Sequence, residues 1–243
     1  MKSRIVLIIM IVLSLQVSAK KIKEEPPVRV QYGVENTGTK LEISFEKGEA
    51  YNHPLFAIWL ADANGNYIQT LYVSQSIGKG VFLRGSRKTG QWMPGEIQRP
   101  AALPYWVHQR NVTNENGGLL PTSKSPVVDA YTGATPKNSF VLEVKTEEKL
   151  QGQYKIMFEL NQSWDWNEYW FNAKYPDDKE YKTSSQPALV YCADIESDNL
   201  QSVEFKAVGY SHYSGKDGNL YKDLNTLTTA LKIANKISAR IAE

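Results

Sequence analysis

Residues 56–73 read FAIWLADANGNYIQTLYV, and this stretch carries the strongest fold signal in the chain. Two apolar runs, 56–60 and 67–73, flank the segment Asp62-Ala-Asn-Gly-Asn66. An Asn-Gly pair between two such runs favours a tight hairpin, because both residues tolerate the positive φ angles that the turn requires. The stretch therefore predicts two antiparallel strands joined at Asn64 and Gly65.

Similar patterns occur on both sides of this hairpin. Alternating or β-branched apolar runs predict further strands at 28–32, 41–45, 140–144, 154–160, 188–195 and 203–208. No helical pattern alternates with these runs. We therefore expect a mainly β protein whose architecture is an immunoglobulin-like antiparallel β-sandwich.

Two segments depart from the strand pattern. Residues 77–139 are rich in Gly, Pro, Asn and Arg, so we expect a long irregular insertion there, and insertions of that length are usually functional or disordered. Near the C-terminus, apolar residues recur every three or four positions, at Leu227, Ala230, Leu231, Ala234, Ile237 and Ile241. This spacing predicts an amphipathic helix over 226–242 that docks over one sheet or one sheet edge.

Residues 1–19 have the organisation of a signal peptide. Lys2 and Arg4 precede an apolar run over 5–15, and small residues lead up to Ala19. The run is shorter than the roughly 20 residues that span a bilayer, although an uncleaved membrane anchor is the alternative. We expect cleavage near Ala19, a periplasmic or otherwise extracytoplasmic location, a polar leader over 20–27 and a single domain over 28–243.

The charge and residue composition exclude several classes of protein. The chain of 243 residues has 28 Lys and Arg against 26 Asp and Glu, and removal of Lys2 and Arg4 leaves 26 of each sign. Such a balance lacks the basic surplus of a nucleic-acid-binding protein. The one cysteine, Cys192, excludes an intrachain disulfide framework, and the three histidines lack the spacing of a metal centre.

The most distinctive local motif is DAYTGATP at 129–136, within the expected insertion. Taken only as local structure, it predicts a surface turn in which Gly133 supplies unusual dihedral angles and Pro136 stops a helix. Taken as chemistry, it presents the hydroxyl of Thr135 beside two small residues, Gly133 and Ala134. The backbone therefore has no bulk beside this hydroxyl.

The pattern Asp129-x-x-Thr132-Gly133-Ala134-Thr135 resembles the flavinylation motif of extracytoplasmic FMN-binding proteins, such as subunits of sodium-pumping quinone reductases. The resemblance implies that Thr135 carries FMN through a phosphoester bond and that a flavin transferase installs it with FAD as the donor. It also implies an exported electron carrier that works with a membrane redox protein, rather than a stand-alone enzyme. The chain has no Ser/His/Asp signature, P-loop or dinucleotide fingerprint.

From Val28 onward the chain resembles the bacterial domain-of-unknown-function family 2271, whose members are predicted periplasmic proteins. The segments that carry this resemblance are LPYWVHQR (103–110), DAYTGATPK (129–137), QPALVY (186–191), GYSHYSGKDGNLY (209–221) and NTLTTA (225–230). Several members of the family look like substrates of flavin transferases, which is consistent with a covalent flavin at Thr135.

A covalent flavin requires partners for its ring. Tyr105 and Trp106 are candidates because aromatic faces stack on flat ligands, and His108 is a candidate proton partner because histidine titrates near neutrality. Core packing is the alternative role for each of them. The aromatic cluster WDWNEYW at 164–170 also favours a different function, a β-sandwich binding module for a glycan or protein, and a structural assembly factor is a third alternative.

Overall fold

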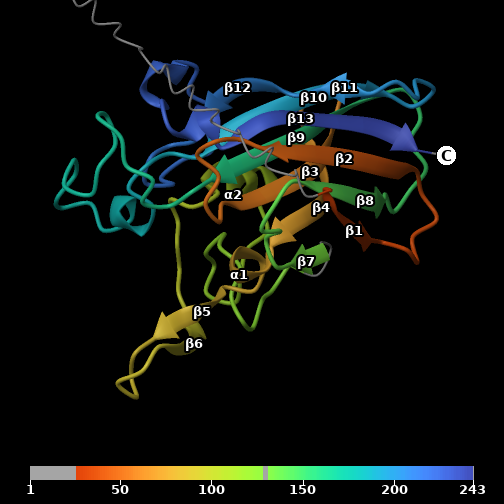
Figure 1. The fold of residues 1–243 in the computed structure, drawn as a ribbon. Coiled ribbons are helices and arrows are strands. Elements are labelled where there is room, and N and C mark those ends of the chain that lie inside the picture. The colour runs from red at the N-terminus through yellow and green to blue at the C-terminus, as the bar shows by residue number, and fades with distance from the viewer. Residues whose placement is uncertain (1–25, 128–130, 243) are drawn as a thin grey trace, which may run out of the picture.

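The computed structural model describes residues 26–127 and 131–242. The predicted signal peptide, most of the leader and Asp129 lie outside the described residues. Strands dominate the described part of the chain, which confirms a mainly β protein (Figure 1). The helical elements are short: α1 (Gln75–Gly78), α2 (Pro104–Arg110) and the 3-10 turns η1 (Tyr181–Thr183), η2 (Leu224–Thr226) and η3 (Ala230–Lys232).

The strands form two larger sheets and one hairpin. The first sheet has the order β1 (Val28–Tyr32), β8 (Phe140–Lys145), β2 (Lys40–Lys47), β13 (Ala234–Ala242) and β11 (Val203–Glu204). The second has the order β12 (Lys206–Tyr210), β10 (Leu189–Glu196), β9 (Gln153–Asn161), β3 (Leu55–Asp62), β4 (Tyr67–Ser74) and β7 (Tyr131–Gly133). The hairpin consists of β5 (Val81–Ser86) and β6 (Met93–Glu96).

The two sheets are mixed, so the expectation of purely antiparallel sheets is wrong. Strand β1 runs parallel to β8, and β7 runs parallel to β4. Parallel pairing needs a long connection between the two strands, and in both pairs a large part of the chain separates the partners. The two exceptions are edge strands, whose direction no short hairpin turn dictates.

A first hydrophobic core lies between the two larger sheets. Alternate residues of β2, among them Phe45, are buried, and they meet alternate residues of β3 and β9. The ring of Phe45 lies 6.3 Å from that of Phe56 on β3 and 5.9 Å from that of Phe158 on β9, measured between centroids. Aromatic contacts across the gap therefore hold the sheets face to face. We call this cluster the inner core.

The opposite face of the second sheet is buried as well. Ala57, Trp59 and Ala61 of β3 point away from the inner core and pack with Leu103 and Trp106 of the insertion. We call this second cluster the outer core. It explains why β3 has a continuous apolar run instead of a clean alternation, since both of its faces are covered. The insertion over 77–139 is therefore not simply irregular, because it includes β5, β6, α2 and β7 and covers a sheet.

The hairpin predicted from the Asn-Gly pair is confirmed as β3 and β4. Gly65 has a φ of +94°, as the turn requires. The Asp62 carboxylate accepts hydrogen bonds from the backbone N–H groups of Asn64 at 2.8 Å and Asn66 at 2.9 Å. The other predicted strands are also confirmed, except that 203–208 divides at Phe205 into β11 and β12, which belong to different sheets.

The C-terminal helix predicted over 226–242 is wrong. Strand β13 occupies most of this segment, and only the short turn η3 precedes it. Ile237, Ala239 and Ile241 are buried while the residues between them are more exposed, so the segment also carries the period of two that a strand needs. A place between β2 and β11 in the first sheet selects the strand, because pairing there buries this face and satisfies the backbone on both sides.

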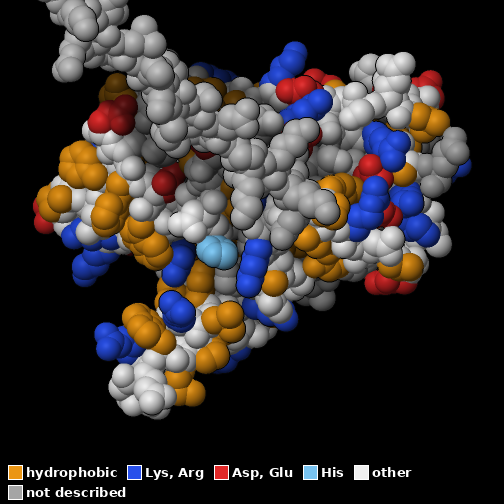
Figure 2. All heavy atoms as spheres, in the orientation of Figure 1, with side chains coloured by type: hydrophobic (Ala, Val, Ile, Leu, Met, Phe, Trp, Pro, Cys, Tyr) orange, Lys and Arg blue, Asp and Glu red, His pale blue; other side chains and the backbone are white. Residues whose placement is uncertain are grey.

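The β5–β6 hairpin contributes Phe82 to the outer core at its base, and its remaining length extends away from both cores. Figure 1 shows it projecting from the two larger sheets, and Figure 2 shows the same projection as an arm of the molecular surface. Phe82 anchors its base, where the guanidinium carbon of Arg99 lies 4.0 Å from the centroid of the Phe82 ring. The tip beyond this anchor is exposed.

Candidate functional site

Strand β7 places the flavinylation-like motif at the edge of the second sheet. Its residues pair in parallel with β4, so that Thr132 lies opposite Val73 and Gly133 opposite Ser74. After Gly133 the chain leaves this sheet and crosses to β8 in the first sheet. Thr135 therefore lies in a connection between the two sheets, where Ala134 is exposed and Thr135 is half-buried.

Gly133 is packed so closely that any added side chain would force its neighbours to move. A Cβ atom built there would lie 1.9 Å from the hydroxyl oxygen of Tyr32 and 3.2 Å from Cε2 of Tyr72. The Tyr72 hydroxyl donates a hydrogen bond of 2.9 Å to the carbonyl oxygen of Gly133. The motif's glycine therefore makes room for two tyrosine side chains. The expectation that Gly133 supplies unusual dihedral angles is wrong, because Gly133 ends strand β7 and is not among the glycines with a positive φ.

The hydroxyl of Thr135 has a defined partner. Its oxygen lies 3.1 Å from the hydroxyl oxygen of Ser74, a buried residue at the end of β4. Ser74 is itself held in place, because its oxygen accepts a hydrogen bond of 3.0 Å from the backbone N–H of Phe56. On the far side of Thr135, the Tyr51 hydroxyl donates to the carbonyl oxygen of Pro136. Hydrogen bonds thus fix the connection both before and after Thr135.

Tyr32, Tyr51 and Tyr72 together form what we call the tyrosine cradle of the motif. Burial raises the pKa of Tyr51 to about 12 and also raises the pKa values of Tyr32 and Tyr72. All three hydroxyls therefore keep their protons at neutral pH. The cradle brings hydrogen-bond donors to the motif and no negative charge.

Two exposed residues, His53 and Lys137, are close in sequence to the cradle and the motif. His53 is exposed and sits between Tyr51 and Phe56, the two residues that tie this loop to the site. Its φ of +56° is uncommon for a residue other than glycine. Lys137 is exposed and follows Pro136 directly. The sequence motif alone did not indicate Ser74, His53 or the cradle tyrosines, because they come from three other parts of the chain.

The other predicted site residues lie on α2, in or beside the outer core. Trp106 is fully buried, and its indole N–H donates a hydrogen bond of 3.0 Å to the hydroxyl of Thr70. The ring of Tyr105 packs 5.9 Å from that of Trp59, and Nε2 of His108 lies 3.1 Å from the carbonyl oxygen of Gly215. Trp106 belongs to the outer core and Tyr105 packs against it, whereas Tyr72 of the cradle belongs to the inner core.

A buried carboxyl group positions α2. Glu159 of β9 accepts hydrogen bonds from the backbone N–H groups of Tyr105 at 3.0 Å and Trp106 at 2.7 Å. Burial raises the pKa of Glu159 to about 8, against the effect of these two hydrogen bonds. The contacts are those of a structural cap, since both partners are backbone groups of the same short helix.

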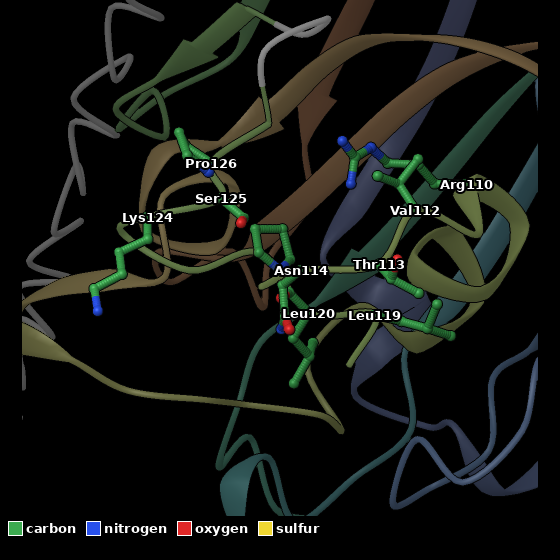
Figure 3. A pocket seen from close by; sticks show the side chains of 10 residues that line it. Arg110, Val112, Thr113, Asn114, Leu119, Leu120, Lys124, Ser125 and Pro126 are labelled. Atoms are coloured by element: carbon green, nitrogen blue, oxygen red, sulfur yellow. The ribbon is translucent and has the colours of Figure 1, made fainter. Parts of the chain in front are cut away.

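Figure 3 shows a pocket within the insertion, lined by residues of 110–114, 119–121 and 124–126. Its volume is about 250 Å³, which is less than the roughly 300–1,000 Å³ of typical small-molecule sites. The side chain of Lys124 points away from the other labelled residues. The pocket shares no lining residue with the motif or the cradle.

Comparison of the chain with family models, curated proteins and solved structures found no match. Among the residues that the structure describes, no group of three or more His, Cys, Asp and Glu side chains is arranged to hold a metal ion. Within the same residues, no helix has both the length and the apolar character needed to cross a bilayer.

Proposed function

We propose that Thr135 carries FMN through a phosphoester bond and that the protein is an exported electron-transfer flavoprotein. The observation that carries the proposal is the placement of the motif. A half-buried threonine hydroxyl follows an exposed alanine on a connection that Ser74, Tyr51 and Tyr72 hold in place. The resemblance of the motif to flavinylation sites points to the same residue.

The side chains around Thr135 fit an acceptor for a phosphoryl group. Ser74 already accepts a hydrogen bond from Phe56, so its own proton is available to the oxygen of Thr135. The neutral cradle avoids repulsion of a phosphate, and Lys137, two residues after Thr135 in the sequence, adds an exposed positive charge to the same connection. In the transfer from FAD, a bond forms between the Thr135 oxygen and the phosphorus of the FMN moiety, the bond to AMP breaks, and AMP leaves as the hydroxyl proton is released.

The partners in this proposal are a flavin transferase and a membrane redox protein, and the location is periplasmic or otherwise extracytoplasmic. When bound, FMN would supply the one- and two-electron chemistry of the carrier. The protein's own residues hold the attachment point at the edge of the sheets. A covalent link outside the cytoplasm also keeps the cofactor at high effective concentration, where a dissociated flavin would be diluted.

Intact mass of the protein purified from its native host tests the attachment. We expect an added mass of one FMN less one water, with flavin fluorescence in the denatured gel band. The variant Thr135→Ala should lose both signals, because no hydroxyl remains at the attachment point. Thr132→Ser is the matched control and should keep both, because the acceptor is intact. An unmodified mass in cells whose flavin transferase modifies another protein would refute the proposal.

A second candidate function is a binding module for a glycan or protein. The observation that favours it is the exposure of four aromatic side chains on one loop segment: Trp164, Trp166, Tyr169 and Phe171. Such side chains stack on sugar rings or anchor protein contacts. Retention on a polysaccharide resin that Trp164→Ala and Trp166→Ala abolish, while Thr135→Ala leaves it unchanged, would favour this function.

We also propose that the two larger sheets have the strand arrangement of an immunoglobulin-like sandwich. In immunoglobulin domains, strand B pairs with E in one sheet, and strands C, F and G are neighbours in the other. The pairing of β2 with β8 supports this correspondence, as does the pairing of β9 with β3 on one side and with β10 on the other. The additional strands β1, β11, β12, β13, β4 and β7 would extend that framework.

A further inference from the structure

The tip of the β5–β6 hairpin combines exposed apolar side chains with positive charge. Leu83 is 84% exposed, Trp92 58% and Met93 46%, which are high values for residues of this type. Figure 2 shows apolar and basic side chains gathered on the projecting arm. These three residues belong to neither core. Packing within the described chain therefore does not explain why they are apolar.

All the charged side chains of the tip are basic. The segment 81–95 contains Arg84, Arg87 and Lys88 and no acidic residue. These three side chains are exposed, and the guanidinium carbon of Arg87 lies 5.1 Å from the ring centroid of Trp92. The tip is thus locally cationic although the mature chain as a whole is expected to be close to neutral.

The hairpin has the geometry of a fixed projection. Gly85 and Gly95 pack so closely that a Cβ on Gly85 would lie 2.2 Å from the carbonyl oxygen of Gly95. Phe82 is buried beneath Arg99 at the base, and the backbone N–H of Ile97 donates to the carbonyl of Gly80 at 3.1 Å. The arm is therefore tied to the body at its base while its tip extends into solvent.

We propose that this hairpin docks the protein on the surface of an anionic lipid bilayer. Leu83, Trp92 and Met93 enter the interfacial region, where tryptophan is favoured because one part of its ring is apolar and its N–H is polar. Arg84, Arg87 and Lys88 bind the lipid phosphates. A convex tip suits a deformable bilayer, whereas a pocket on a folded partner would need a complementary shape. The proposal does not rest on the flavin at Thr135.

Fluorescence quenching at Trp92 tests the docking locally. The protein as purified from its host is mixed with vesicles of phosphatidylglycerol and brominated phosphatidylcholine. We expect the brominated lipid to quench part of the tryptophan emission of the unchanged protein. Trp92→Phe should lose this quenching, and Trp166→Phe should retain it. Because the readout belongs to the hairpin, binding through the N-terminal apolar run would not reproduce it. Thr135→Ala should behave as the unchanged protein does, whether or not a flavin is attached.

Charge reversal tests the electrostatic part. The triple variant Arg84→Glu, Arg87→Glu and Lys88→Glu should weaken vesicle binding at least tenfold. The matched control reverses three exposed lysines elsewhere and makes the same change in net charge: Lys149→Glu, Lys179→Glu and Lys206→Glu. The control should bind within about twofold of the unchanged protein, since these residues lie outside the tip. Both triple variants should unfold at the same temperature as the unchanged protein.

Three results would overturn the proposal. The first is equal loss of binding in the two triple variants, which would show attraction by net charge alone. The second is vesicle binding without quenching at Trp92. The third is no binding to anionic vesicles. Protection of the hairpin by another protein would then identify the tip as a protein interface instead.

Discussion

Gly133 connects the chemistry of the motif with the packing around it. The same absence of a Cβ that leaves the chain thin beside Thr135 also lets the hydroxyl of Tyr32 and the ring of Tyr72 approach the backbone. A close-packed site of this kind tolerates added volume poorly, because neighbouring rings must move together. The residue therefore matters for stability whether or not the motif is flavinylated.

We predict that Gly133→Ala lowers the free energy of unfolding by about 1–3 kcal/mol, as overpacking typically does. Urea denaturation measures the change. Gly118→Ala is the control, because a Cβ atom built there would come no closer than 3.2 Å to the side-chain amide of Asn114, against 1.9 Å to Tyr32 at Gly133. Equal stability of Gly133→Ala and the unchanged protein would contradict the close approach of Tyr32.

The buried carboxyl group of Glu159 should make the free energy of unfolding depend on pH. Burial raises the pKa of its carboxyl group from the usual 4.5 to about 8, so the folded protein binds this proton more tightly than the unfolded chain does. The stability that the proton contributes is fully present below about pH 4.5 and is lost as the pH rises through about 8. Between pH 5 and 8.5, we expect the free energy of unfolding of the unchanged protein to fall relative to that of Glu159→Gln.

Urea denaturation of both proteins at several pH values measures this difference. Glu159→Gln keeps one oxygen acceptor for the N-terminus of α2 but does not titrate. Parallel pH profiles for the two proteins would show that Glu159 has an ordinary pKa in the folded state.

At the scale of elements, the C-terminal segment shows how a strand can carry a helical pattern. Its apolar residues satisfy a spacing of three or four positions over 227–241, and Ile237, Ala239 and Ile241 also satisfy a spacing of two. Short apolar segments are ambiguous in this way. The first sheet resolves the ambiguity because β13 gains backbone partners on both sides, β2 along its length and β11 at Ala239 and Ser238.

A central strand should not tolerate proline. We predict that Ser238→Pro lowers the free energy of unfolding by about 3 kcal/mol or more, because it removes a ladder hydrogen bond and its ring disturbs the pairing with Ser44. Ser238→Ala should change it by less than about 1 kcal/mol. Thermal unfolding followed by circular dichroism compares the two variants. A small effect of proline would mean that β13 is not a central strand.

At the scale of the whole molecule, the two cores and the projecting hairpin should differ in local stability. The strands β2, β3 and β9 are buried between sheets or beneath the insertion, whereas the tip over 83–94 is largely exposed. Backbone amides in a buried sheet exchange with solvent through large-scale unfolding, and those in an exposed tip exchange through local opening.

Hydrogen–deuterium exchange measures this difference. We expect peptides of β3 and β9 to be the slowest to exchange and peptides of 83–94 to be among the fastest. Anionic vesicles should slow exchange in 83–94 only. Equal protection of the tip and of β3 in the absence of vesicles would mean that the tip is covered by part of the molecule or by a second copy.

The sequence by itself determined those features that depend on neighbouring residues. The β3–β4 hairpin follows from Asn64 and Gly65, and most of the strands follow from their own alternation, because turn geometry and side-chain direction are local properties of the backbone. The motif at Thr135 is equally local, and the sequence alone directs attention to it.

The features that depend on contacts between residues distant in the sequence were decided only by the tertiary structure. The pairing of β13 with β2 turned an expected helix into a strand, and the covering of β3 on both faces placed Trp106 in the outer core. Ser74, Tyr32 and Tyr51 reach the motif from three separate elements or loops. No local pattern predicts such contacts, because they result from the way in which the sheets together bury apolar area and satisfy backbone hydrogen bonds.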